Sequence, residues 1–113
     1  NWTKGKSGDT YGHIGPWVVT RDEIPDPQSL DLWLKVNGQT MQNGNTNTMI
    51  FGVRTIVSYL SQCMSLQPGD VIATGTPPGV GQGMNPPVFL KSGDKVETSV
   101  SGLGTQQQIV IER

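Results

Sequence analysis

The sequence predicts a mainly β domain of the α+β class, a mixed β-roll or sandwich with one short amphipathic helix. Only 34% of the 113 residues are hydrophobic, and the chain holds 15 glycines and 8 prolines. This composition favours short strands joined by many turns over a helical bundle. Apolar and polar residues also alternate in two separate stretches, 30–37 and 95–100, which is the period of a half-buried strand.

The first part of the chain shows little periodicity. Residues 1–15 are rich in Gly, Ser and Thr and predict an extended polar loop. Residues 15–20, with the sequence GPWVVT, favour a short strand. Residues 21–28 are charged and interrupted by prolines, which indicates a surface connection.

A hairpin is the clearest local prediction. The strand at 30–36 is followed by Asn37-Gly38, a dipeptide typical of a type I′ turn because both central residues need positive φ. Residues 39–42 are expected to form the return strand, and residues 43–48 a second polar loop. Two further strands, at 95–100 and 106–111, are expected to be joined by a turn at 102–104.

One amphipathic helix follows the polar loop. Its apolar residues fall at helical spacing and form a single stripe over about three turns. They are Met49, Ile50, Val53, Ile56, Val57 and Leu60. Asn47 or Thr48 is placed to cap the first turn through its side chain.

The stretch 70–83, DVIATGTPPGVGQG, combines an apolar run with a loop rich in Gly and Pro. Residues 71–73 predict a buried strand that leads into the loop. Glycine allows a backbone to approach a ligand closely, and the two prolines stiffen the path. Threonine hydroxyls and free N–H groups at a strand end suit a carboxylate or carbonyl oxygen. A tight structural turn explains the same pattern equally well.

Charge and cysteine content limit the functional classes. A net charge of −1 gives no indication of a nucleic-acid partner or an anionic membrane surface. No window approaches the ~20 apolar residues that span a bilayer. No signal peptide is recognised, and the single Cys63 favours a reducing, cytoplasmic location. The chain begins at Asn1, so we expect residues 1–113 to be a single-domain segment, the C-terminal part of a longer catalytic domain.

Residues suited to catalysis are few. Lys6 lies in GKSGD and could hold a carboxylate through a charge-assisted hydrogen bond of about 1.5–3 kcal/mol, although a solvated lysine fits the spacing better. A nucleophilic triad would need His13 as its base, and no G-x-S-x-G motif is present. Cys63, near the helix end, is expected to be packed. The chain alone is not expected to form a complete metal site.

Several motifs in order resemble the C-terminal half of the fumarylacetoacetate hydrolase family. They are W-x-x-G-K-S-x-D-T, G-P-W-V-V-T, D-E-I-P-D-P, N-G-x-x-x-Q, N-T-x-x-M-I-F and L-x-P-G-D-V-I-A-T-G-T-P-x-G-V-G. Two later segments, P-P-x-F-L-x-x-G-D and G-L-G-x-Q, resemble those of bacterial 2,4-diketo-3-deoxy-sugar-acid hydrolases. The resemblance covers nearly the whole chain and implies a mixed β-roll with short helices.

The resemblance implies a metal-dependent hydrolase that cleaves a C–C bond of a 2,4-dioxo acid, with Mg²⁺ or Mn²⁺ binding the 2-oxo acid substrate. It implies that Lys6 is a catalytic residue that reaches toward the substrate, and that Gly75 and Thr76 bind the substrate carboxylate. Asp9 is expected to support neighbouring residues or the fold, and His13 to have no catalytic role. The family's metal ligands, a Glu-x-Glu pair and an aspartate, are absent from this chain, as is a histidine–glutamate pair that activates water in some members.

Two alternatives remain open. Hydratase, isomerase, decarboxylase or lyase chemistry on a 2-oxo acid occurs in the same fold, because a fold does not determine a reaction. The missing carboxylates also allow a catalytically inactive piece that serves as a folding or dimerisation unit. Family members usually form homodimers, so a homodimer is expected, with Trp33 or the hairpin as candidate contacts.

Overall fold

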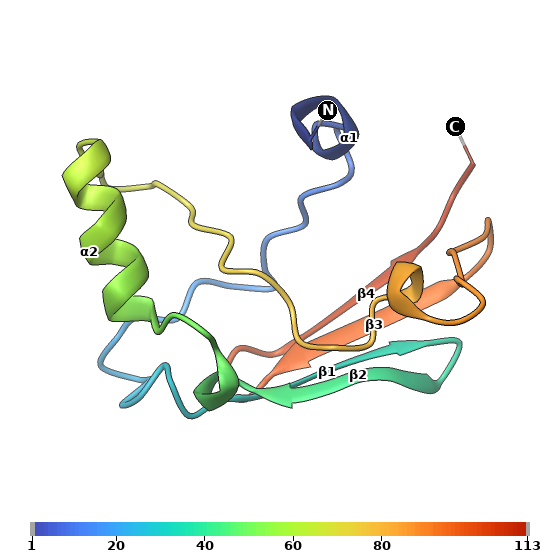
Figure 1. Ribbon diagram of the computed structural model, residues 1–113. Helices are drawn as coiled ribbons and strands as arrows, with labels where there is room; N and C mark the ends of the chain where they lie inside the picture. Colours follow the sequence, from blue (N-terminus) through green and yellow to red (C-terminus); the bar gives the residue numbers. More distant parts are fainter. Residues whose placement is uncertain (1, 113) are drawn as a thin grey trace.

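The computed structural model describes residues 2–112, and its main feature is one four-stranded antiparallel sheet in the order β2-β1-β3-β4 (Figure 1). The strands are β1 (Asp31–Val36), β2 (Gln39–Asn45), β3 (Lys95–Val100) and β4 (Thr105–Ile109). The other elements are the helices α1 (Trp2–Lys6) and α2 (Val53–Cys63) and the short 3₁₀ helices η1 (Thr46–Thr48) and η2 (Gly81–Gly83). The predicted mainly β class is confirmed. The described strands lie in a single antiparallel layer, whereas the prediction allowed a mixed roll or a sandwich.

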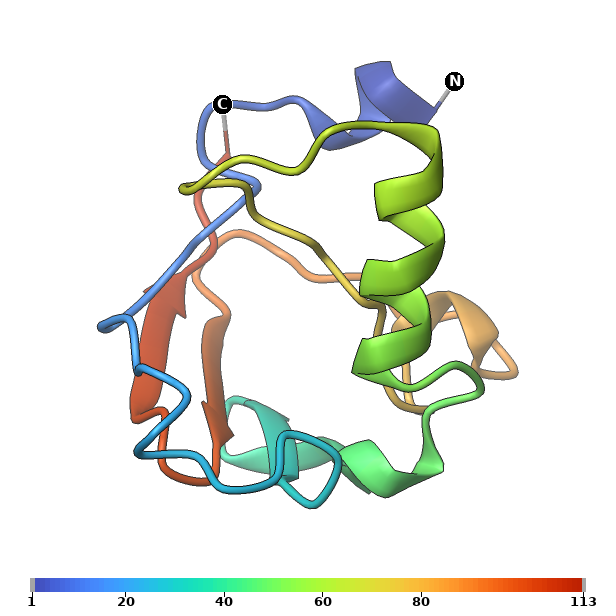
Figure 2. The same ribbon diagram turned by 90° about the vertical axis from the view of Figure 1, so that its left-hand side faces the viewer.

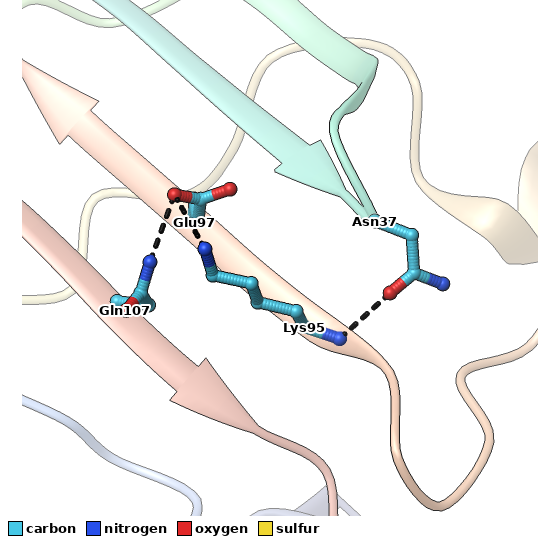
Figure 3. A network of polar contacts seen from close by, with 4 residues as sticks. All are labelled: Asn37, Lys95, Glu97 and Gln107. Carbon is cyan, nitrogen blue, oxygen red and sulfur yellow. Dashed lines mark hydrogen bonds and ion pairs between the residues drawn. The ribbon is translucent and has the colours of Figure 1, made fainter.

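The β1–β2 hairpin turns at Asn37-Gly38, as the sequence predicts. Both residues have positive φ, +50° at Asn37 and +82° at Gly38, which a type I′ turn requires. The Asn37 side chain also joins the turn to β3. Its Oδ1 accepts the backbone N–H of Lys95 at 2.9 Å (Figure 3). Its Nδ2 donates to Asp94 Oδ1 at 2.9 Å. Asn37 therefore links segments nearly 60 residues apart at this end of the sheet.

Two acidic side chains, one just before β3 and one on it, have lowered pKa values. The pKa of Asp94 lies below its ordinary value of 3.8 because the carboxylate accepts the backbone N–H of Lys91 and the side-chain amide of Asn37. The pKa of Glu97 is lowered by a hydrogen bond from Gln107 and by Lys95, whose Nζ lies 3.3 Å from the carboxylate (Figure 3). Carboxylates of this kind stabilise the fold above their unfolded pKa, and the contribution is lost as the pH falls through the folded pKa.

We therefore expect the Asn37→Ala variant to raise the pKa of Asp94, because it removes one of the two hydrogen bonds that favour the ionised carboxylate. A pH titration of the Asp94 carboxyl carbon by NMR measures this directly. In the variant, the midpoint should move upward toward the ordinary value. As the pH is lowered, the free energy of unfolding should begin to fall at a higher pH in the variant than in the wild type. An unchanged midpoint would contradict the assigned cause.

Three local predictions are wrong. Residues 2–6 form a short helix instead of a loop, with Lys4 and Lys6 in the last turn, where positive charge suits the helix dipole. Residues 15–20 and residues 71–73 are not strands. In the part of the chain that the structure describes, neither run has a backbone partner in the sheet, and an isolated extended run forms no ladder.

Helix α2 begins later than predicted, at Val53, and neither Asn47 nor Thr48 caps it. Its N-cap is Gly52, which offers no side-chain acceptor. The acceptor comes instead from Gln28, whose Oε1 takes the backbone N–H of Val53. Gln28 supplies a capping acceptor from 25 residues earlier in the chain, so no local capping motif could have revealed it.

The sheet and α2 do not cover one another. The principal contacts between elements join neighbouring strands, and Figure 2 shows α2 on the opposite side of the chain from β3 and β4. Within residues 3–112 no hydrophobic side chain is buried, and large apolar side chains such as Ile50 (92% exposed) and Phe89 (67% exposed) face outward. The described helices include none that is long and apolar enough to cross a membrane.

Candidate functional site

The loop that follows α2, residues 74–80, lies against β2. A Cβ atom on Gly79 would come within 2.0 Å of the carbonyl oxygen of Met41, and one on Gly44 within 2.9 Å of Pro77 Cβ. Gly79 also has a φ of +109°, and Gly75 has a φ of +106°. Glycine on both sides of this contact therefore lets the loop approach the strand closely, and Gly75 supplies the backbone conformation just before Thr76.

Gln42, on β2, holds this loop by two hydrogen bonds. Its Nε2 lies 2.7 Å from Thr76 Oγ1 and 2.7 Å from the backbone oxygen of Pro77. Gln42 is 8% exposed, and no other residue between 3 and 112 is as deeply buried. Thr76 itself is exposed. The result is an exposed threonine whose hydroxyl is hydrogen-bonded to a buried glutamine of the sheet.

Lys6 and Asp9 lie on a different part of the molecule. Lys6 is the last residue of α1, Asp9 belongs to the turn after it, and both are exposed. Figures 1 and 2 both draw α1 apart from the loop 74–80, which lies lower in each view, near the sheet. Gly75 and Thr76 lie in the loop beside β2, and their convergence with Lys6 on one ligand stays a prediction.

Two grooves lie elsewhere on the described part of the chain. One, of about 320 Å³, is lined by residues 13–16 and 105–108, and therefore includes His13. The other, of about 390 Å³, lies along α2 between Arg54 and Gln62. Neither groove is lined by Lys6 or Thr76. Cys63, expected to be packed, is instead a free and exposed thiol.

The described residues do not form a binding site for a divalent metal ion. Among residues 2–112 no three His, Cys, Asp or Glu side chains lie close enough together to hold a metal ion. A hard cation such as Mg²⁺ prefers several oxygen ligands, usually with one or two carboxylates. The described residues therefore do not fit the metal that the sequence resemblance implies.

Comparison with known proteins identifies the family. The family model for the fumarylacetoacetate (FAA) hydrolase C-terminal domain matches residues 1–111. The chain belongs to the fumarylacetoacetate hydrolase family. A Burkholderia multivorans member that carries the name of a hydrolase is 64% identical over 109 residues, which are 96% of this chain and 39% of that protein.

Solved structures of the family share the fold. A fumarylacetoacetate hydrolase from psychrophilic Exiguobacterium antarcticum is 45% identical with a TM-score of 0.93, over 97% of this chain and 39% of that chain. A 2-hydroxyhepta-2,4-diene-1,7-dioate isomerase from Mycobacterium marinum is 41% identical with a TM-score of 0.84, over 98% of this chain and 40% of that one. A maleylpyruvate hydrolase from Sphingobium sp. SYK-6, in complex with manganese (II) ion and pyruvate, is 38% identical with a TM-score of 0.76. The match covers 86% of this chain and 34% of that one.

The relatives that the chain resembles include proteins named as hydrolases and one named as an isomerase. The chain spans about two fifths of the length of the relatives it matches, so much of each relative has no counterpart in residues 1–113.

The interpretation of the sequence missed one residue of this site, Gln42. It was recognised only as the last letter of the N-G-x-x-x-Q motif. The sequence holds no other signal for it, because a glutamine beside an apolar residue such as Met41 is the ordinary alternation of a half-buried strand. Its partner Thr76 lies 34 residues later, and nothing in the local pattern indicates that the two residues meet.

Proposed function

We propose that this chain is the carboxylate-binding part of a metal-dependent hydrolase that cleaves a C–C bond of a 2,4-dioxo acid, either an acylpyruvate or a 2,4-diketo-3-deoxy sugar acid. The observation that carries the proposal is the exposed Thr76 hydroxyl, attached to the sheet through Gln42 at 2.7 Å. A donor fixed in this way suits a substrate carboxylate, because it needs little reorganisation on binding. The maleylpyruvate hydrolase that binds manganese and pyruvate supports a 2-oxo acid as the ligand class.

Lys6 has the second role in this proposal. Its ammonium group would bind an oxygen of the substrate, because charge-assisted hydrogen bonds to anionic oxygens are the stronger kind. Lys6 lies at the exposed end of α1, so its side chain is accessible to a ligand. Asp9 is proposed to support this segment and not to touch the substrate.

The Mg²⁺ or Mn²⁺ of this proposal would need ligands from outside residues 1–113, namely a Glu-x-Glu pair and an aspartate. We refer to the longer catalytic chain that would supply them as the intact polypeptide. It is supported by the length of the relatives, of which this chain covers about two fifths. Without that part, residues 1–113 would be a folding or dimerisation unit with no activity of their own.

An isomerase is the second candidate, favoured by the similarity to the Mycobacterium marinum enzyme. An isomerase would move a double bond within a 2-oxo acid and release no second product. Because hydrolase and isomerase neighbours share this fold, only the products distinguish the two reactions.

The test is an assay of the intact polypeptide with Mg²⁺ or Mn²⁺ on a panel of acylpyruvates, 2,4-diketo-3-deoxy sugar acids and an unsaturated 2-oxo dioic acid. Release of pyruvate together with a carboxylic acid is expected, and that acid is a hydroxy acid when the substrate is a 2,4-diketo-3-deoxy sugar acid. A chelator should abolish the reaction. A shifted absorbance without a second product would establish the isomerase instead. Release of CO₂ would indicate decarboxylation, and no conversion of any compound would refute both candidates.

The proposed assembly is a homodimer in the cytoplasm. The exposed free thiol of Cys63 is suited to a reducing compartment. The large apolar side chains left exposed among the described residues provide surface for contacts with further polypeptide, a second copy included. Sedimentation of the intact polypeptide distinguishes a dimer from a monomer.

A further inference from the structure

We propose that Gln42 is a positioning residue, which fixes the hydroxyl of Thr76 as a hydrogen-bond donor toward the acid group of the ligand. The inference rests on the proposed function, because it takes a carboxylate as the ligand of Thr76. It goes further by assigning the direction of the Thr76 hydroxyl and the residue that controls it.

The orientation of the Gln42 amide follows from its second partner. The backbone oxygen of Pro77 lies 2.7 Å from one end of the amide, and a carbonyl oxygen can only accept. A reversed amide would place Gln42 Oε1 against this oxygen, two acceptors at hydrogen-bond distance. The donor nitrogen Nε2 must therefore face Pro77.

The direction of the Thr76 hydroxyl follows in turn. The same Nε2 lies 2.7 Å from Thr76 Oγ1 and has no lone pair to accept a proton, so the hydroxyl oxygen accepts. The proton of the Thr76 hydroxyl must therefore point away from Gln42 Nε2. Among the described residues, the acceptor within its reach is the Pro77 oxygen at 3.4 Å, a long contact to a group that Gln42 already occupies. A ligand carboxylate is a better acceptor, and Thr76 is exposed to it.

The position of Gln42 makes this control rigid. Gln42 pairs with Leu34 of the central strand β1, beside the irregularity between Leu34 and Lys35. The close contacts of Gly79 with Met41 and of Gly44 with Pro77 lie on either side of it. Because the side chain is 8% exposed, little water can compete for its two N–H groups. The hydroxyl is thus held by a buried donor on a paired strand and not by a mobile loop.

The test is a double-mutant cycle in the intact polypeptide, with pyruvate affinity in the presence of Mg²⁺ as the first readout and kcat and KM for the hydrolysed substrate as the second. Gln42→Met keeps the volume and removes the donor, so pyruvate affinity should fall about fivefold to tenfold. In a Thr76→Val background the same change should cost almost nothing, because no hydroxyl is left to direct. Gln39→Met, at an exposed position of the same strand, is the matched control and should leave affinity unchanged.

Gln42→Glu is the second variant, and it has nearly the same shape as the native residue. Its carboxylate would accept the proton of Thr76 and turn the hydroxyl away from the ligand, so affinity should fall further than in Gln42→Met. Equal losses from Gln42→Met in the wild-type and Thr76→Val backgrounds would mean a purely structural role and would overturn this inference alone. If the wild-type polypeptide neither binds pyruvate nor converts any 2-oxo acid, the proposed function and this inference both fail.

Discussion

Replacing Thr76 by valine in the intact polypeptide is expected to lower turnover of the 2,4-dioxo acid about 10²–10³-fold, the usual cost of losing one donor to a developing or bound oxyanion. Valine keeps the shape of threonine and removes only the hydroxyl. That hydroxyl is the exposed group which Gln42 attaches to β2. Steady-state kinetics on the substrate identified in the panel assay measure the effect.

Two further variants separate the hydroxyl from the fold. Thr76→Ser keeps the hydroxyl and should retain most of the activity. Thr74→Val changes an exposed threonine of the same loop that has no contact with Gln42 in the structure and should have little effect. Wild-type kinetics in Thr76→Val would remove Thr76 from the site, whatever reaction the enzyme performs.

Residues 1–113 by themselves are expected to lack a stable, cooperatively unfolding structure. Their accessible surface is 9168 Å², whereas a folded monomer of 12.2 kDa exposes about 6,100 Å². The radius of gyration of 15.5 Å also exceeds the ~13 Å of a compact domain of this length. With no hydrophobic side chain buried among residues 3–112, burial of apolar surface cannot offset the conformational entropy lost on folding.

Near-ultraviolet circular dichroism, dye binding and thermal unfolding test this expectation. The isolated chain should bind a hydrophobic dye and lose its signal gradually, and the intact polypeptide should unfold in one sharp transition. Phe89→Ala provides a matched variant. Phe89 is 67% exposed in this chain, so the change should leave the spectrum and dye binding of the isolated chain nearly unchanged. If further polypeptide buries the ring, the change should lower the free energy of unfolding of the intact polypeptide by about 3–5 kcal/mol. A monomeric isolated chain with a sharp transition would contradict the expectation.

Much of the sheet could be predicted because its signals are local. Asn37-Gly38 specifies its turn through the positive φ of two adjacent residues, and the alternating pattern of 31–36 and 95–100 marks two strands that the structure confirms. The strand predicted at 71–73 failed for the opposite reason. Its apolar run is typical of a buried strand, but in the region that the structure covers no strand pairs with it, and Val71 is 69% exposed.

The residues of the candidate site also divide into those that the local sequence predicted and those that it did not. Gly75 and Thr76 were predicted from the glycine- and proline-rich loop together with the family resemblance, and their binding of a substrate stays a prediction. Lys6 came from the resemblance, and its approach to Thr76 stays a prediction. The metal ligands could not be found in this chain, and the described residues provide no set that would replace them.

By itself, the sequence determined the family, the mainly β class, the hairpin and the loop that carries Thr76, since each depends on residue types at short fixed spacing. Only the tertiary structure decided which side chains hydrogen-bond to that loop and to the N-terminus of α2. Gln42 meets Thr76 across 34 residues, and Gln28 caps α2 from 25 residues away. Each contact depends on how the strands pair and how the chain folds back, and no spacing of residue types records that geometry.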